Sequence, residues 1–346
     1  MSSSSIRVIA AVLAFAVVAV VGIVLLNFAG EGAVTSWAYV TLAALGVAFI
    51  TYAAIEYAQT RSFESITRQF DTRTLVLIPI AIALNIILGQ AVGAALKIPI
   101  YLDSIGTILV GALAGPIPGA LTGLLANLLW TAVIPPPFHS DIAAAFAVVA
   151  AVIGLLAGAY SRFGWLRPRP TEDTSRLAVA AVVAIAIIAV LAYLAYLGWI
   201  AIGEGINLTP TGDTMFVILS FLALALVVAT IIGLAAMLFL RRDITAAYVV
   251  VAGVVTGIVA AIISAPISAN LFSGVTAAGT DFLVAAFRQA GADIQAATLG
   301  QGLISDPIDK VITFAVVYVI LGAMARRTKA RFPQGERLID IEPEAT

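Results

Sequence analysis

Cysteine is absent from this chain, and charge and histidine are scarce. Of its 346 residues none is Cys, one is His, and 11% are charged. A disulfide framework, a thiolate nucleophile and a Cys-ligated metal are therefore excluded, and a single His cannot form a His-rich metal site. We expect neither a metal site nor a cofactor. The net charge of −1 gives no field to attract nucleic acid, so we expect no nucleic-acid partner.

Common catalytic motifs are also missing. The chain has no GxxxxGK[ST] and no Gly-Lys dipeptide, so it does not cradle a nucleotide phosphate in the manner of a P-loop. The HExxH pattern of zinc proteases and the GxSxG elbow of serine hydrolases are absent as well. The sequence therefore predicts a protein that is not an enzyme and does not hydrolyse ATP itself.

Apolar residues dominate instead. They make up 62% of the chain, and the mean hydropathy is +1.10. A soluble globule cannot hide that much apolar surface, so an integral membrane protein is predicted. Apolar runs of about 20 residues can cross a hydrocarbon layer about 30 Å thick as helices. The expected fold is an all-α polytopic membrane helix bundle of about ten spans, at 6–28, 36–58, 74–96, 101–115, 117–134, 141–160, 177–202, 214–240, 244–267 and 307–325.

Basic residues indicate the orientation, because they gather in cytoplasmic loops. They follow the second, sixth, eighth and tenth spans, at Arg61, Arg68, Arg73, Arg162, Arg167, Arg169, Arg176, Arg241, Arg242, Arg326, Arg327, Lys329, Arg331 and Arg337. The alternate connections hold few cations, and Lys97 and Arg288 are the exceptions. We expect a multi-pass protein of the plasma membrane with both termini in the cytoplasm.

The block from Ile100 to Trp130 combines glycines with isolated polar residues. Four of its glycines recur at a spacing of four, at 111, 115, 119 and 123, and two prolines divide the block into two helices. Glycine costs a helix about 1 kcal/mol relative to alanine, and in membranes its usual purpose is close helix approach. The spacing therefore predicts one packed face on each helix, with Asn127 on the second face pointing into the protein.

Polar side chains inside an apolar layer are costly, so we treat them as functional candidates. By the predicted topology a set of them falls in the outer third of the membrane. The predicted substrate-binding residues are Asp103, Asn127, Trp130, His139, Asp141, Asn270, Asp309 and Lys310. Together they predict a pocket open to the outside, where amide and carboxylate groups bond a small polar solute and an indole stacks on a flat ring.

These candidates also have structural interpretations. Asp103 precedes a helix start and would serve equally well as an N-cap. Asp306 and Pro307 resemble the first turn of the last span, where they would satisfy free amides and the helix dipole. Lys310 would then pair with Asp306, four residues earlier. His139 lies in a proline-rich outer loop, where a solvated side chain is the plain interpretation.

Ridges of small residues recur on two other spans. They include Asn85, Gly89 and Gly93 on the third span, and Gly253 and Gly257 on the ninth. Such ridges allow tight contacts between helices. Ordinary packing within the bundle would explain them, whereas a ridge facing lipid would dock another membrane subunit. Both alternatives stay open, and these five residues are the docking candidates.

The longest stretch between predicted spans is 268–306. Within it, the sequence TDFLVAAFRQAG places Phe282, Leu283, Ala286 and Phe287 on one helical side. This pattern predicts an interfacial helix, which would act as a lid or as a structural cover of the outer mouth.

Three segments carry a family resemblance: IPIYLDSIGTILVGALAGPIPGALTGLLANLLW, the preceding ALNIILGQ, and the closing DPIDKVITFAVVYVILGAMARR. They resemble the substrate-binding S components of energy-coupling factor (ECF) transporters. The resemblance implies a six-helix core with both termini inside and a vitamin-like solute in an outer pocket. It also implies docking on a transmembrane T component driven by two ATPase subunits. The family's AxxxA docking pattern near the start of its first core helix is absent from this sequence.

The resemblance implies a division of the chain into a core and two added hairpins. An N-terminal two-helix hairpin at 1–72 precedes four core helices at 73–162, and a second hairpin is inserted at 163–243. The last two core helices follow at 244–327, with the outer loop 268–306 between them and a cytoplasmic tail at 328–346.

Three functions follow as alternatives. The first is a substrate-capture subunit of an ATP-driven importer for a vitamin- or nucleobase-like micronutrient, which works with a separate T component and ATPases. The second is a stand-alone ion-coupled secondary transporter that uses Asp103, Asp309 and Lys310 near broken helices. The third is a non-transporting membrane scaffold whose ridges bind other helices.

Overall fold

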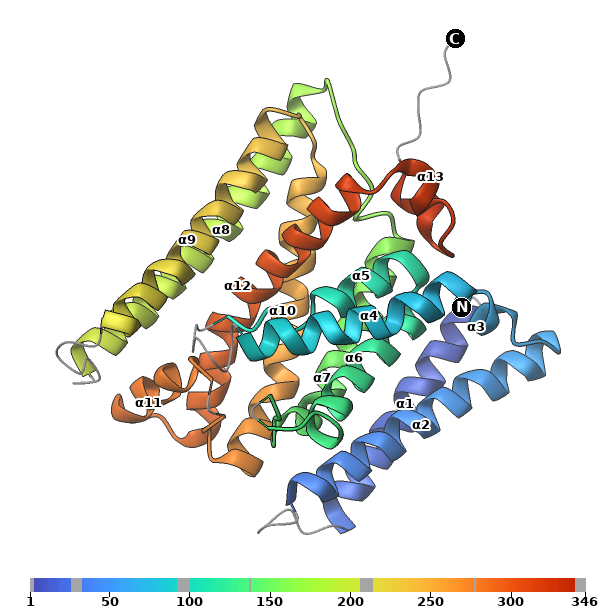
Figure 1. Ribbon diagram of the computed structural model, residues 1–346, viewed down its shortest axis with the longest axis horizontal. Coiled ribbons are helices and arrows are strands. Elements are labelled where there is room, and N and C mark those ends of the chain that lie inside the picture. Colours follow the sequence, from blue (N-terminus) through green and yellow to red (C-terminus); the bar gives the residue numbers. More distant parts are fainter. Residues whose placement is uncertain are drawn as a thin grey trace.

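The computed structural model describes residues 3–25, 33–91, 100–136, 138–205, 214–276 and 278–339 (Figure 1). Within these ranges the chain is helical and has no β-strand, which confirms the all-α part of the predicted fold class. The longer helices are α1 (Ser3–Leu25), α2 (Ala33–Thr60), α4 (Thr72–Leu88), α5 (Ile105–Ala114), α6 (Pro116–Ala132), α7 (Ala147–Arg162), α8 (Thr174–Gly205), α9 (Thr214–Phe239), α10 (Thr245–Phe272), α11 (Asp281–Gln289) and α12 (Ile294–Ala323). The short ones are α3 (Glu64–Thr67), α13 (Arg326–Lys329) and two 3-10 turns, Ala143–Phe146 and Gly335–Leu338.

Each of the ten predicted spans falls on one of the longer helices. Five described segments are long and apolar enough to cross a membrane: Ser36–Thr60, Thr72–Ala91, Ala143–Arg162, Thr174–Leu194 and Thr245–Phe272. Helix α5 has ten residues, and at 1.5 Å per residue it is only about 15 Å long. The count of ten spans and the side of the membrane on which the termini lie stay predictions.

The last long helix starts earlier than expected. Helix α12 begins at Ile294, and its N-cap is Asp293, whose carboxylate accepts the N–H of Ala296 at 2.8 Å. Asp306 and Pro307 therefore lie inside the helix, and their predicted role in capping it is wrong. The apolar run misplaces the start because charged residues in the middle of α12 lower its local hydropathy.

Helix α11 lies in the outer stretch where a helix is predicted. It packs against α12 and α8, and Leu283, Val284 and Ala286 on it are buried. Figure 1 shows it beside the N-terminal end of α12. The predicted amphipathic helix is confirmed, and its function as a lid or as a cover stays open.

The glycine block packs α5, α6 and α7 at close range. A Cβ placed on Gly119 would lie 2.7 Å from Gly111 Cα of α5 and 2.7 Å from the Gly154 carbonyl oxygen of α7. A Cβ on Gly123 would overlap the backbone of α7. Gly115 joins α5 to α6 with a φ of +130°, which L side chains rarely adopt. The predicted close helix approach is confirmed.

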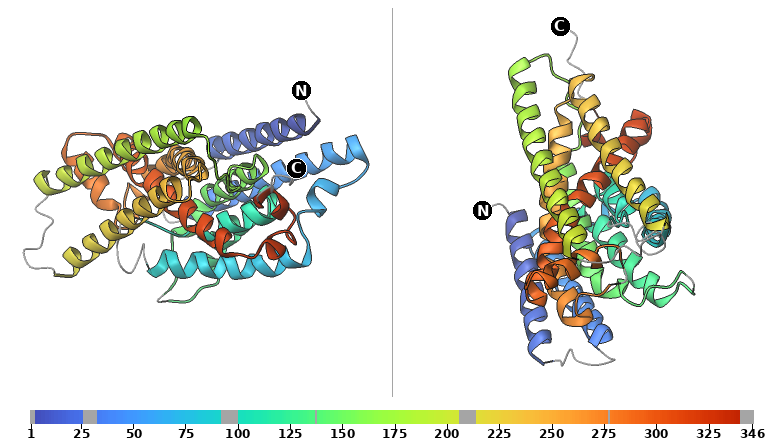
Figure 2. Two further views of the ribbon diagram at one scale, coloured as in Figure 1. Left: turned by 90° about the horizontal axis from the view of Figure 1, so that it is seen from above. Right: turned by 90° about the vertical axis from the view of Figure 1, so that its left-hand side faces the viewer.

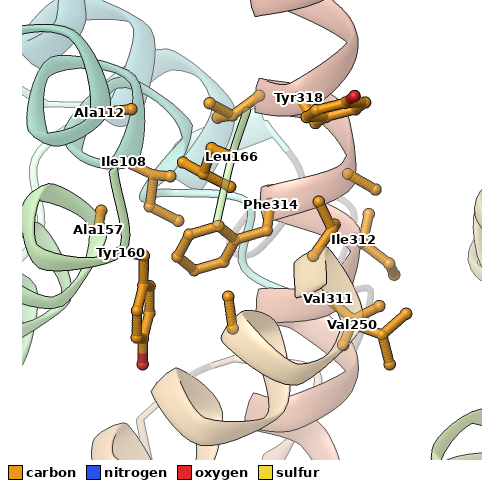
Figure 3. Close-up of a cluster of buried hydrophobic side chains, with 14 of the residues drawn as sticks. Ile108, Ala112, Ala157, Tyr160, Leu166, Val250, Val311, Ile312, Phe314 and Tyr318 are labelled. Carbon is orange, nitrogen blue, oxygen red and sulfur yellow. The ribbon is translucent and has the colours of Figure 1, made fainter. Parts of the chain in front are cut away.

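Helices α10 and α12 form a second closely packed pair. A Cβ on Gly253 would overlap Val311, and a Cβ on Gly257 would overlap the backbone of Pro307. Phe314 of α12 is fully buried, and Figure 3 shows its ring pointing toward side chains of α5 and α7. The hydrophobic core thus joins the α10–α12 pair to the glycine-packed helices.

Two helical hairpins flank this core. Helices α1 and α2 pack on each other, and α2 contacts the core through Trp37, whose indole N–H donates to the Ala145 carbonyl oxygen at 2.9 Å. Helices α8 and α9 contact α10 and α12. Figures 1 and 2 show the two hairpins at opposite ends of the molecule, with the remaining helices between them, and the division into a core and two added hairpins stays a prediction.

The arginine-rich connections gather at one end of the bundle. Arg73, at the start of α4, donates to the Arg331 carbonyl oxygen at 3.3 Å. Arg167, after α7, donates to the Arg337 carbonyl oxygen at 3.1 Å. Arg169 and the end of α9 meet at Asp243, which accepts the Arg169 N–H at 2.9 Å. We call this the arginine-rich end. Its shared location agrees with connections that lie on one face of a membrane.

The glycine packing predicts a test. The substitution Gly119→Ala places a methyl group against two backbones, and overpacking of this kind costs about 1–3 kcal/mol. Gly233→Ala on α9 is the matched control, because nothing lies within 4 Å of a Cβ at that position. We expect thermal unfolding in detergent at a lower temperature for Gly119→Ala and at an unchanged or higher temperature for Gly233→Ala. Equal melting of the two variants would contradict the packing.

Candidate functional site

A buried ion pair on α12 holds the segment that leads into α5. Asp309 and Lys310 are 0% and 3% exposed, and the Lys310 ammonium lies 2.5 Å from Asp309 Oδ2. Asp309 Oδ1 accepts the backbone N–H groups of Tyr101 (3.0 Å) and Leu102 (2.9 Å). Lys310 also donates to Ser104 Oγ at 2.9 Å. The pair therefore fixes three residues of the segment 100–104.

These bonds supply acceptors for backbone N–H groups that make no helical hydrogen bonds. Residues 100–104 are not helical, and Leu102 has a φ of +52°, in the left-handed region that non-glycine residues rarely adopt. A buried N–H without an acceptor costs about 1–3 kcal/mol. The Asp309 carboxylate removes that cost for two N–H groups and thereby holds the segment in its irregular conformation.

Asp103 lies beside the ion pair and is partly open to its surroundings. Its side chain is 31% exposed, and its Oδ1 is 3.8 Å from the Lys310 ammonium. The interpretation of Asp103 as an N-cap is wrong, because Ser104 occupies the N-cap position of α5 and no side-chain cap bond forms there. The expected ion pair between Lys310 and Asp306 is also wrong, because Asp309 and Asp103 are the acidic partners.

Asp306 adds a third carboxylate one turn earlier on α12. It is 7% exposed and accepts a hydrogen bond from Ser305 Oγ at 3.2 Å, and Ser305 accepts one from Gln301 at 2.6 Å. Lys310 interacts electrostatically with all three carboxylates. We call Asp103, Asp306, Asp309 and Lys310 the Lys310 cluster. With one ammonium among three carboxylates, it is rich in hydrogen-bond acceptors.

The connection between α10 and α11 meets the same segment. Tyr101 Oη lies 2.6 Å from Thr280 Oγ1, and Thr276 Oγ1 donates to Asp281 at 2.7 Å. Sequence reasoning missed Tyr101, Ser104 and Thr280 as members of the site. Tyr101 and Ser104 flank Asp103 and could have been included for that reason, whereas Thr280 carries no signal that would link it to them.

Trp130 and Asp103 meet at Gly89 of α4. A Cβ on Gly89 would lie 2.6 Å from the Trp130 ring and 3.0 Å from Asp103 Cβ. The Trp130 indole N–H donates to the Phe138 carbonyl oxygen at 2.8 Å, and the ring is buried inside the bundle. Trp130 is therefore held in place by contacts inside the protein. These contacts account for its position without a role at the membrane interface.

Asn127 lies one turn before Trp130 on α6. It is 8% exposed, which confirms that it points into the protein. Its amide makes no hydrogen bond to another described residue. Its amide donors and acceptor can therefore bond a small polar group that reaches them.

Helix geometry places the Lys310 cluster within the depth of the bundle. Tyr318 donates to Asp243 at 2.6 Å at the arginine-rich end, and Lys310 lies eight residues, or about 12 Å, away from it along α12. Asn270 lies roughly 38 Å along α10 from Thr245 at the same end. The predicted site residues therefore do not share one depth along the bundle.

Three other predicted site residues make separate local contacts. His139 Nε2 lies 2.9 Å from Asp141 Oδ1, and His139 Nδ1 lies 3.0 Å from the Ile134 carbonyl oxygen. Asn270 accepts a hydrogen bond from Gln295 at 2.8 Å. Their part in solute binding stays a prediction.

The predicted docking residues that the structure describes take part in packing inside the chain. Asn85 donates to Thr107 Oγ1 at 2.8 Å and accepts the Gly106 N–H at 2.7 Å, which joins α4 to α5. Side chains or backbone of neighbouring helices also cover the ridge glycines of α4 and α10, while Gly93 lies outside the described residues. Docking of a second subunit stays a prediction for Asn85, Gly89, Gly93, Gly253 and Gly257.

A groove of about 320 Å³ lies between α10 and the start of α12. It is lined by Ile262, Ala265, Pro266, Asp293, Gln295, Ala296 and Leu299. The lining is mostly apolar and contains none of the predicted binding residues. The groove is therefore a different place from the Lys310 cluster.

The buried ion pair predicts a large effect on stability. Lys310→Met leaves the Asp309 carboxylate buried without its cation, and breaking a buried pair costs about 3–5 kcal/mol. The control Arg68→Met removes the partner of Glu64 from an exposed pair on the surface, which contributes at most about 1 kcal/mol. We expect Asp309→Asn with Lys310→Met to cost less than the two single substitutions added together. Additive losses in chemical unfolding would contradict the pairing.

No family model matches the chain, and the comparisons with curated proteins and with solved structures find no match. The chemistry of the Lys310 cluster, Trp130 and Asn127 therefore carries the functional argument. These groups offer carboxylate oxygens, an ammonium, an indole and an unpaired amide, a set that suits a small polar solute with a flat ring.

Proposed function

We propose that the protein is the membrane-embedded substrate-capture subunit of an ATP-driven micronutrient importer, for a vitamin- or nucleobase-like solute. The observation that carries the proposal is the buried Asp309–Lys310 pair, which holds the segment 100–104 so that Asp103 stays partly exposed beside Trp130. Charged groups inside a membrane bundle are costly and usually mark a solute or ion path.

The proposed recognition chemistry uses the hydrogen-bond donors and acceptors that the protein itself leaves unused. Asp103 uses one oxygen toward Lys310 at 3.8 Å, and its exposed portion accepts a solute N–H or O–H. The Asn127 amide offers two donors and one acceptor that no other described residue uses. Trp130 supplies a fixed apolar wall. A flat heterocycle with donors and acceptors on its edge would use all three.

Partner subunits belong to the proposal because this chain carries no nucleotide-binding motif. A separate T component and two ATPase subunits would supply the energy, as the resemblance to ECF S components implies. The arginine-rich end would face the cytoplasm of the cell and the Lys310 cluster would open to the outside, in line with the positive-inside rule.

Substitution of Trp130 tests the site. Trp130→Phe keeps an aromatic ring but removes the indole N–H that bonds to the Phe138 carbonyl oxygen. Because the ring is then no longer held in position, we expect less solute to be retained. Trp37→Phe is the matched control, because it removes the same kind of bond, from an indole N–H to a backbone carbonyl, at a tryptophan outside the proposed site. We expect about tenfold weaker solute binding for Trp130→Phe only, since one such loss is worth about 1–1.5 kcal/mol.

The assay is mass spectrometry of the solute that remains bound through purification, followed by titration of that solute. Equal retention by the two tryptophan variants would contradict the proposed site. Retention of no solute by the wild type, together with continued association with other membrane proteins after Asn127→Ala, would favour the scaffold alternative instead.

A second function has an observation of its own. The Lys310 cluster holds three carboxylates and one ammonium inside the bundle, and Pro307 lies inside the same helix. Buried ionisable groups beside an interrupted helix are typical of ion-coupled secondary transporters. In that case Asp306 and Asp103 would bind the coupling proton or cation.

Reconstitution separates the two functions. If the protein is an importer subunit, a proton or sodium gradient should drive no solute uptake into vesicles that contain this protein alone. Uptake should begin only when the T component and the ATPases are added together with ATP. Gradient-driven uptake by the lone protein, lost in Asp306→Asn, would contradict the importer proposal and establish the secondary transporter.

A further inference from the structure

Three arginines that are not part of the Lys310 cluster meet at the arginine-rich end. Arg162 ends α7, Arg167 lies in the connection to α8, and Arg337 lies in the 3-10 turn Gly335–Leu338. Arg337 Nη1 donates to the Arg162 carbonyl oxygen at 2.6 Å, and Arg167 Nε donates to the Arg337 carbonyl oxygen at 3.1 Å. We call these residues the arginine triad.

The triad is not neutralised by carboxylates among the residues that the structure describes. Neighbouring arginines at the same end have acidic partners: Arg176 lies 3.4 Å from Asp173, and Arg242 lies 3.8 Å from Glu172. The members of the triad form no such ion pair, and the charges of Arg162 and Arg337 repel each other. An unbalanced group of positive charges of this kind attracts an anion.

Each guanidinium of the triad is held in place through one nitrogen. Arg337 and Arg167 use theirs on backbone carbonyls. Arg162 Nε donates to the Gln334 side-chain oxygen at 3.0 Å, in the amide orientation that also lets Gln334 donate to Gly158 and Ser161. The remaining N–H groups stay available. A guanidinium fixed in this way presents a fork of donors that matches the oxygens of a phosphate.

The position of the triad favours a lipid phosphate over a free one. Arg162 is the last residue of an apolar helix that is long enough to cross a membrane, and Phe163, the next residue, is 71% exposed. An exposed apolar ring at the end of such a helix can pack against acyl chains, while the neighbouring arginines reach the headgroups. An anion that carries acyl chains can contact Phe163 and the triad together, whereas inorganic phosphate can use only the triad.

We propose that the arginine triad binds the phosphate of an anionic phospholipid in the cytoplasmic leaflet, with the acyl chains against Phe163. The cytoplasmic leaflet is the one that the positive-inside rule assigns to this end, and anionic lipids there attract basic groups. The bound headgroup would join α7 to the C-terminal segment. The proposal is independent of the function proposed above.

The test uses the full chain in nanodiscs of phosphatidylcholine, with and without phosphatidylglycerol. We expect phosphatidylglycerol to raise the melting temperature of the wild type and to be retained in native mass spectrometry. Arg162→Gln with Arg337→Gln should lose this shift, and its apparent affinity should fall roughly fivefold for each arginine, since each contributes about 1 kcal/mol. The control Arg176→Gln with Arg242→Gln removes the same number of charges from ion pairs at the same end and should keep the shift.

Three outcomes overturn the proposal, and a lysine variant decides it if the glutamine variant does not fold. An equal shift for the double variant and the control overturns it, as does an equal shift of the wild type with inorganic phosphate alone. The segment 340–346 has three acidic residues. If phosphatidylglycerol raises the melting temperature only after this segment is deleted, its carboxylates neutralise the triad in the intact protein, and the proposal is also overturned. If the double glutamine variant does not fold, Arg162→Lys with Arg337→Lys decides: lower retention of phosphatidylglycerol than in the wild type supports the proposal, and unchanged retention contradicts it.

Discussion

The structure depends most on a charged pair that a membrane bundle would ordinarily exclude. Asp309 and Lys310 are buried next to each other on α12, and the free energy of removing two charges from water is recovered only if all their bonding groups are used. Asp309 meets that condition by accepting two backbone N–H groups, and Lys310 by donating to Ser104. The pair therefore ties an irregular segment to a long helix, which apolar side chains could not do.

Close packing of the glycine-rich helices gives this tie a fixed frame. Helices α5, α6 and α7 approach until backbone contacts backbone, and α10 and α12 do the same around Gly253 and Gly257. Because Phe314 links the two groups through the core, the 100–104 segment is held between elements that cannot shift independently. Asp103 and Trp130 acquire their positions from that frame, which is what preorganised recognition of a solute needs.

Much of the architecture could be predicted from the sequence, because apolar runs and glycine spacing report directly on helices and their contacts. The start of α12 could not, since the hydropathy pattern registers Asp306 and Lys310 as a break, whereas the structure absorbs them inside one helix. The acidic partners of Lys310 were also beyond prediction. Spacing along one helix favours Asp306, but Asp103 comes from a segment 207 residues earlier, and its approach is a property of the tertiary fold.

The most direct test of the account is amide hydrogen exchange at Tyr101 and Leu102, because their N–H groups bond to Asp309. The account predicts slow exchange at both amides in the wild type and much faster exchange in Asp309→Asn, with the amides of α7 unchanged. Equal exchange in the two proteins would show that the buried pair does not hold the segment, and the proposed solute site would lose its physical basis.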